Sequence, residues 1–94
     1  MSQPNTNKSY TEQRVNFFLK CIGEEMFSLR KSYKKSIKTV AKETKMSPGI
    51  LSKVEKGTYD NLCMTRLILL CKYYSVDIRD IIDRAEYKDR NNTI

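Results

Sequence analysis

The most concentrated chemistry in this 94-residue sequence is the positive charge between Arg30 and Lys56. This window contains nine Lys and Arg residues but only two acidic residues, Glu43 and Glu55. The whole chain has 18 basic and 11 acidic residues and a net charge of +7, so the window carries the entire excess and the remaining sequence is balanced. Charge segregated in this way predicts a surface that binds a polyanion, most often nucleic acid. A solvated, lysine-rich helix face is the other interpretation that the charge allows.

The sequence offers little for catalysis or metal binding. It contains no histidine, which removes the commonest general base and the commonest metal ligand. Cys21, Cys63 and Cys71 lie in apolar stretches and show no Cys-x-x-Cys spacing, so we expect three buried thiols and no zinc site. The three glycines are isolated from one another, which argues against a glycine-rich phosphate loop. We therefore predict that the protein is not an enzyme and uses no metal or cofactor.

Hydropathy also gives no reason to expect contact with a membrane. The longest unbroken apolar run is five residues, 67–71, whereas a membrane helix needs roughly 20. The polar residues 1–10 do not resemble a secretory signal. Since the cysteines show no pairing pattern either, the expected compartment is the cytoplasm.

Apolar residues recur every three or four positions, which predicts helices and no strand. The longest stripe consists of Val15, Leu19, Ile22, Met26, Leu29 and Tyr33. We expect five helices, over about residues 11–33, 36–45, 47–56, 63–74 and 78–90. The predicted fold is a compact all-α domain over residues 11–90, preceded by a flexible polar tail over residues 1–10.

The two short helices over residues 36–45 and 47–56 carry the functional argument. Ser36 and Ser47 are suited to be their N-caps, and Pro48 suits the first helical position of the second helix. A tight turn between two such helices is typical of a helix-turn-helix unit, whose second helix enters the major groove of DNA.

One face of the second short helix has side chains that could contact DNA. Leu51 and Val54 are expected to face the core, and the opposite face then presents Pro48, Gly49, Ser52, Lys53 and Lys56. The small residues leave room for close approach, and Ser and Lys can hydrogen-bond to base edges. Backbone N–H groups at the helix starts, after Ser36 and Ser47, can bind phosphates. A generic surface helix with a Pro-Gly start is the alternative.

Several segments resemble the phage repressor and Cro type of helix-turn-helix domain, also called the xenobiotic-response-element family. The most specific are residues 46–57 (MSPGILSKVEKG) and 76–82 (VDIRDII), and shorter matches lie at residues 22–24, 29–31 and 40–41. The resemblance spans about residues 20–83. It implies a five-helix, lambda-repressor-like domain that binds a pseudo-palindromic DNA operator as a homodimer.

The resemblance also implies roles for individual residues. Base-facing positions are Pro48, Gly49, Ser52 and Lys53. Positions near the phosphates are Ser36, Lys38 and Lys56, to which the helix-start argument adds Ser47. Arg30 and Glu55 match a structural ion pair between the first and third helices, so Glu55 is expected to be architectural.

The sequence departs from the family pattern in three places. Ile37 stands where many members carry a phosphate-contacting Gln, and we expect it to pack instead. Lys45 stands where the turn often has Gly, so a slightly different turn is expected. Pro48 and Gly49 replace a Gln or Arg, so readout is expected to depend on few side chains and on DNA shape.

The leading hypothesis is a sequence-specific, double-stranded-DNA-binding transcriptional repressor. A protein-interaction module, such as the DNA-binding antitoxin of a toxin–antitoxin pair, is the alternative. It is suggested by aromatic residues that could lie at an exposed surface or dimer seam rather than in the core, namely Phe17, Phe18, Phe27, Tyr73 and Tyr74. Non-specific DNA or RNA binding is a third possibility, although no RNA-binding loop or sheet signal is present.

Overall fold

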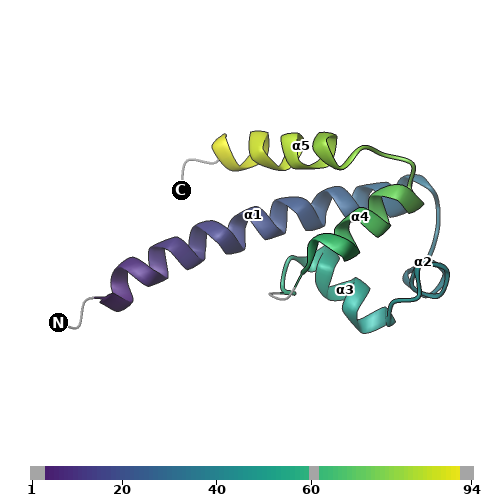
Figure 1. The fold of residues 1–94 in the computed structure, drawn as a ribbon, viewed down its shortest axis with the longest axis horizontal. Coiled ribbons are helices and arrows are strands. Elements are labelled where there is room, and N and C mark those ends of the chain that lie inside the picture. The colour runs from purple at the N-terminus through teal and green to yellow at the C-terminus, as the bar shows by residue number, and fades with distance from the viewer. Residues whose placement is uncertain (1–3, 60–61, 92–94) are drawn as a thin grey trace.

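The computed structural model describes residues 4–59 and 62–91, and side chains from Tyr10 onward. This part of the chain forms five helices and no strand (Figure 1). They are α1 (Pro4–Ser32), α2 (Ile37–Thr44), α3 (Pro48–Lys56), α4 (Met64–Tyr73) and α5 (Ile78–Arg90). The predicted all-α, five-helix fold is therefore confirmed. None of the described helices has the length and apolar character needed to cross a membrane.

The helix α1 begins earlier than the apolar periodicity of the sequence predicts. The helix begins at Pro4 rather than near Thr11, and residues 1–3 lie outside the described part of the chain. Proline is tolerated at a helix start because its missing N–H would have no helical partner there. The first half of α1 extends beyond the other helices (Figure 1). A projecting helix needs no continuous buried stripe, so apolar periodicity does not reveal where it begins.

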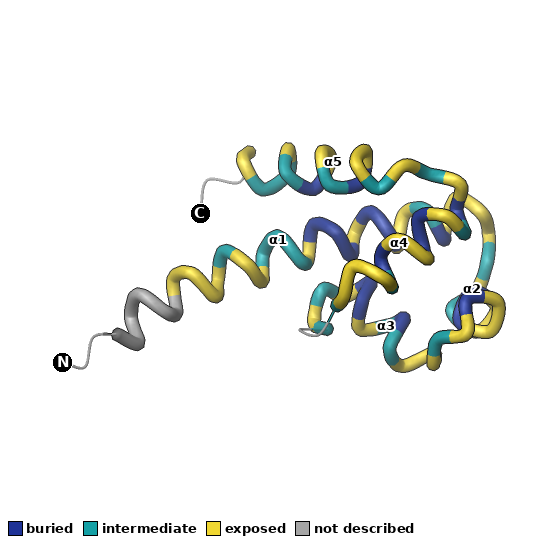
Figure 2. Tube along the Cα trace, viewed as in Figure 1, coloured by how far each residue is buried: buried dark blue, intermediate teal, exposed yellow. Residues whose placement is uncertain are grey.

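The core forms where the second half of α1 packs against the other helices. Figure 2 shows buried residues concentrated in that half of α1 and along the inner sides of α3 and α4. The largest fully buried side chains are Tyr74, Met26, Leu51, Leu70 and Ile81. Burying a side chain of this size contributes about 1.5–3 kcal/mol in gross terms. Val15 and Tyr33, at the two ends of the predicted α1 stripe, are exposed instead.

Two glycines allow α3 to lie close to α1. A Cβ added to Gly23 would lie 2.5 Å from the carbonyl oxygens of both Val54 and Glu55. Gly57 ends α3 with a left-handed φ of 71°, and its own added Cβ would lie 2.5 Å from the Cα of Lys20. These close approaches fix the position of α3 against α1, and a helix that contacts a ligand needs such a fixed position.

Ion pairs join α1 to α5, which runs antiparallel beside it (Figure 1). Glu25 accepts from Arg84 Nε at 3.0 Å and lies 2.9 Å from Lys88 Nζ. Arg14 Nη2 lies 3.3 Å from Asp89 Oδ2. Charges outside the basic window are thus partly paired with one another, as their balanced number suggests.

The cysteines differ in their surroundings. Cys21 and Cys71 are buried, as expected, and burial raises the pKa of both thiols. Cys63 is exposed, which contradicts the prediction of a buried thiol. It is the N-cap residue of α4, and the backbone N–H of Arg66 lowers the pKa of its thiol. A position that caps a helix lies at the edge of the core even when its neighbours in sequence are apolar.

Candidate nucleic-acid interface

The first helix of the predicted unit, α2, is positioned by a capped start and a buried inner face. Ser36 Oγ accepts a hydrogen bond from the Thr39 N–H at 3.1 Å. Val40 and Ala41 are buried as predicted. Ile37, which stands where many family members carry Gln, packs against the core as expected. The exposed side of α2 includes Lys38.

The turn between α2 and α3 retains a left-handed residue without a glycine. Lys45 has φ 59° and ψ 38°, so the expectation of a changed turn is not met. The Met46 N–H donates to the Ala41 carbonyl at 2.9 Å, and Met46 packs against the core. These contacts offset the cost of a non-glycine residue in this conformation, which is about 1–2 kcal/mol.

The second helix, α3, has an inner and an outer face at the spacing that the sequence predicts. Its start is capped by Ser47 Oγ, which accepts from the Ile50 N–H at 3.1 Å, and Leu51 and Val54 are buried. The other face includes four exposed residues, Pro48, Gly49, Lys53 and Lys56, and the partly buried Ser52. A Cβ added to Gly49 would meet nothing within 4 Å. The protein's own packing therefore gives no reason for glycine at this position.

Arg30 and Glu55 form the ion pair that the family resemblance implies. Arg30 Nε and Nη2 donate to the two carboxylate oxygens of Glu55 at 2.8 and 3.0 Å, and both residues are buried. Arg30 Nη1 also donates to the Lys35 carbonyl at 2.9 Å. The hydrogen bonds with Glu55 raise the pKa of Arg30. One guanidinium thus connects α1, α3 and the segment leading to α2.

A second charged cluster attaches α2 to the end of α4, and no local sequence pattern predicts it. Lys35 Nζ lies 3.1 Å from Glu43 Oε1 and donates to the Tyr73 hydroxyl at 2.9 Å. The Tyr73 hydroxyl in turn donates to Glu43. The hydrogen bonds that Tyr73 and Lys35 donate lower the pKa of the Glu43 carboxyl, and the bond from Tyr73 has the larger effect.

These two clusters account for both acidic residues of the basic window. Their partners, Arg30 and Lys35, are the two cations whose charge is compensated within it. Within the described part of the chain, the other seven cations of the window form no ion pair, and all are exposed: Lys31, Lys34, Lys38, Lys42, Lys45, Lys53 and Lys56. The net charge of the window therefore faces solvent, where an anion can reach it.

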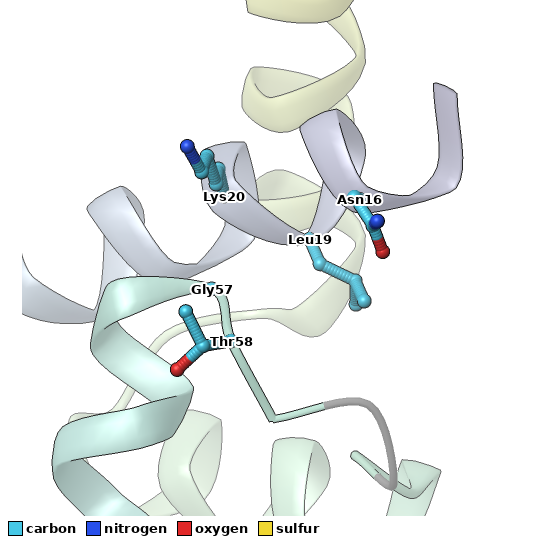
Figure 3. Close-up of a pocket in the computed structure, with 5 residues that line it drawn as sticks. All are labelled: Asn16, Leu19, Lys20, Gly57 and Thr58. Atoms are coloured by element: carbon cyan, nitrogen blue, oxygen red, sulfur yellow. The ribbon is translucent and has the colours of Figure 1, made fainter. Parts of the chain in front are cut away.

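The rest of the described surface contains no comparable cluster of exposed basic side chains. A hollow between α1 and the end of α3 is lined by Asn16, Leu19, Lys20, Gly57 and Thr58. The Lys20 ammonium points away from Gly57 and Thr58 (Figure 3). Across the described residues, no group of three or more His, Cys, Asp or Glu side chains could hold a metal ion.

A capped helix pair with a tight turn and an exposed, basic second helix defines a DNA-binding helix-turn-helix domain. A family model described as Helix-turn-helix matches residues 27–81, more than half of the chain. The chain belongs to this family, in its phage repressor and Cro type. Domains of this family are DNA-binding and regulatory rather than enzymatic. No curated protein and no solved structure gives a significant match.

Proposed function

We propose that this protein is a sequence-specific transcriptional repressor that reads the major groove of double-stranded DNA with α3 and acts as a homodimer. The observation that carries the proposal is the combination of uncompensated lysines with an open face on α3. Pro48, Gly49, Ser52 and Lys53 lie on this face and are proposed to contact bases. Lysine can donate to guanine acceptors, and serine can donate or accept.

The phosphate contacts are proposed for Ser36, Lys38, Ser47 and Lys56. The hydroxyls of Ser36 and Ser47 already cap their own helices, so the neighbouring backbone N–H groups are the available donors. At the start of α2, the N–H groups of Ile37 and Lys38 have no partner within the helix. At the start of α3, Pro48 has no N–H. The start of α2 is therefore the stronger backbone phosphate site.

We expect Lys53→Ala and Lys38→Ala to weaken DNA binding in different ways. Lys53→Ala should cost about 1–3 kcal/mol on the preferred site and relax one base position, because a base contact carries sequence information. Lys38→Ala should weaken binding to all sequences alike and reduce the salt slope by about one. Binding sites selected from random duplex DNA, followed by anisotropy titrations at several salt concentrations, would measure both effects.

Lys72→Ala is the matched control, because it removes an exposed lysine of α4 outside the basic window. It loses the same charge and should have a much smaller effect. Unchanged affinity in both Lys53→Ala and Lys38→Ala would refute the proposed interface. If both variants weakened binding to the selected site and to random DNA by the same factor, the result would favour non-specific binding.

Gly49→Ala is expected to have opposite effects on stability and on DNA binding. The methyl group meets open space, and φ at Gly49 is not positive, so removing a helical glycine should stabilise the fold by about 0.5–1 kcal/mol. The same methyl group would obstruct close approach to base edges and should reduce specific affinity about tenfold or more, which is about 1.4 kcal/mol. Urea unfolding and a titration with the selected duplex would measure the two effects. Unimpaired binding by a stabilised Gly49→Ala variant would exclude close approach at this position.

The antitoxin alternative shares the same DNA-binding face and adds a bound toxin. Repression alone predicts that the purified chain represses a promoter carrying its selected site. A reporter assay with that promoter tests this prediction, and repression only in the presence of a second protein would favour the alternative.

A further inference from the structure

The segment that leads into α2 is held in place by the end of α4. Tyr33, the first residue after α1, donates from its hydroxyl to the Tyr74 carbonyl at 2.5 Å, and the two rings lie 5.4 Å apart. Lys35 donates to the Tyr73 hydroxyl at 2.9 Å, and its ammonium lies 5.2 Å from the centre of the Tyr73 ring. Figure 1 shows this end of α4 beside the end of α1, where the segment begins. The segment is therefore fixed immediately before Ser36, the N-cap of α2.

The other end of α2 is held by the same tyrosine. The Tyr73 hydroxyl donates to Glu43, which lies in the last turn of α2 and also accepts from Lys35 at 3.1 Å. Lys35, Glu43 and Tyr73 are called the α2–α4 cluster below. It reaches from the residue before the N-cap of α2 to the last turn of the helix. Since α2 has only eight residues, contacts at both ends determine its direction as well as its position.

Lys35 also connects this cluster to α3. Its carbonyl accepts from Arg30 Nη1 at 2.9 Å. The other nitrogens of Arg30 bind the carboxylate of Glu55, a residue of α3, at 2.8 and 3.0 Å. The backbone of Lys35 is thus tied to α3 and its side chain to α4. A surface that binds a DNA backbone and the adjacent groove requires such a fixed relation between its two helices.

Stability alone gives little reason for the α2–α4 cluster. The side chains of Lys35 and Glu43 are 34% and 47% exposed, and ion pairs as open as this contribute little to the free energy of unfolding. Glu43 is also an anion within the basic window, where its charge opposes the binding of a polyanion. Its role in holding α2 accounts for an acidic residue at this place.

We infer that Tyr73, acting through Lys35 and Glu43, positions the start of α2 on a DNA phosphate without touching the DNA itself. The inference rests on the proposed function, which assigns a phosphate to the N–H groups of Ile37 and Lys38. A start of α2 that is already ordered loses less conformational freedom on binding. Loss of the cluster therefore weakens DNA binding even when every lysine remains, which makes Tyr73 a positioning residue.

Tyr73→Phe is the first test, with affinity measured by anisotropy on the selected duplex and on random duplex at several salt concentrations. It removes only the hydroxyl and keeps the ring, whose edge contact with Tyr74 has a centroid distance of 5.1 Å. Affinity for both duplexes should fall by the same factor, about three- to tenfold, because phosphate contacts carry no sequence information. The salt slope should stay at the wild-type value because no lysine is lost, whereas Lys38→Ala should reduce it by about one. The midpoint of urea unfolding should be nearly unchanged.

Glu43→Ala is the second test, because positioning and simple electrostatics predict opposite results. Electrostatics alone predicts tighter DNA binding, since the substitution removes a negative charge and releases the ammonium of Lys35. Positioning predicts weaker binding, by about the same factor as Tyr73→Phe. Glu43→Gln retains an oxygen that can accept from Tyr73, so it should bind DNA more tightly than Glu43→Ala. Tyr87→Phe removes a hydroxyl from an exposed tyrosine of α5 and, as the matched control, should bind like the wild type.

Three results would overturn the inference. Glu43→Ala could bind DNA more tightly than the wild type, or Tyr73→Phe could bind with wild-type affinity. A shallower salt slope in Tyr73→Phe would instead assign its hydroxyl to a direct contact with the DNA.

Amide hydrogen exchange without DNA separates a failure of this inference from a failure of the proposed function. The N–H groups of Thr39 and Val40 donate to Ser36 at the start of α2 and should exchange faster in Tyr73→Phe than in the wild type. If they do, while Lys53→Ala and Lys38→Ala bind DNA like the wild type, the DNA interface is refuted. If they do not, while both lysine variants weaken binding, the DNA interface stands and the positioning role of Tyr73 is refuted.

Discussion

Gly23→Ala is expected to destabilise the domain strongly, and far more than the same substitution at Gly49. The new Cβ would lie 2.5 Å from two backbone carbonyl oxygens of α3 and 2.9 Å from the Glu55 carbonyl carbon. Backbone atoms cannot rotate away as the end of a side chain can, so α3 must move off α1. Overpacking typically costs about 1–3 kcal/mol, and a backbone clash should reach or exceed the upper end of this range. Urea unfolding followed by circular dichroism would measure it.

Gly49→Ala serves as the matched control for Gly23→Ala. Both substitutions add one methyl group to a helical glycine, and both gain the same helix propensity. They differ in what the methyl group meets, which is backbone at Gly23 and open space at Gly49. A Gly23→Ala variant as stable as the wild type would show that α1 and α3 do not approach each other this closely.

Glu55→Ala is expected to cost about 3–5 kcal/mol of folding free energy, because it leaves the buried Arg30 guanidinium without its carboxylate. Arg30 also donates to the Lys35 carbonyl, so the start of α2 should loosen along with α3. The expected result is a lower midpoint of urea unfolding and weaker DNA binding by the remaining folded molecules. Glu43→Ala, which removes the carboxylate of the exposed pair with Lys35, should have a much smaller effect on stability.

The double variant Arg30→Met with Glu55→Leu distinguishes a buried ion pair from a general packing role. Replacing both charges removes the uncompensated cation, so stability should recover in part relative to Glu55→Ala. Recovery is expected to be incomplete because the hydrogen bond to the Lys35 carbonyl is also lost. A double variant that is less stable than Glu55→Ala would contradict this account of the pair.

The helix-turn-helix unit could be predicted from the sequence because its signals are local. Ser36 and Ser47 cap their helices as predicted. Caps and apolar spacing act within about four residues, so they can be read along the chain. The face of α3 follows from the same spacing, since Leu51 and Val54 determine which side is buried.

Contacts between distant residues could not be predicted in this way. Glu43 and Tyr73 are 30 positions apart, and no local pattern brings them together. Apolar periodicity also predicts too late a beginning for α1, because a projecting helix does not require an apolar stripe. Cys63 was expected to be buried on the basis of apolar neighbours, but its place at the start of α4 exposes it.

The sequence by itself determined the number of helices, the position of the turn and the location of the net charge, because each depends on residue types over short distances. Only the tertiary structure decided how that charge is used. It pairs Arg30 with Glu55 and Lys35 with Glu43, and it leaves seven lysines of the same window exposed and without an ion-pair partner among the described residues. Pairing requires side chains from different helices to lie within a few ångströms of each other, and packing around a shared core sets these distances.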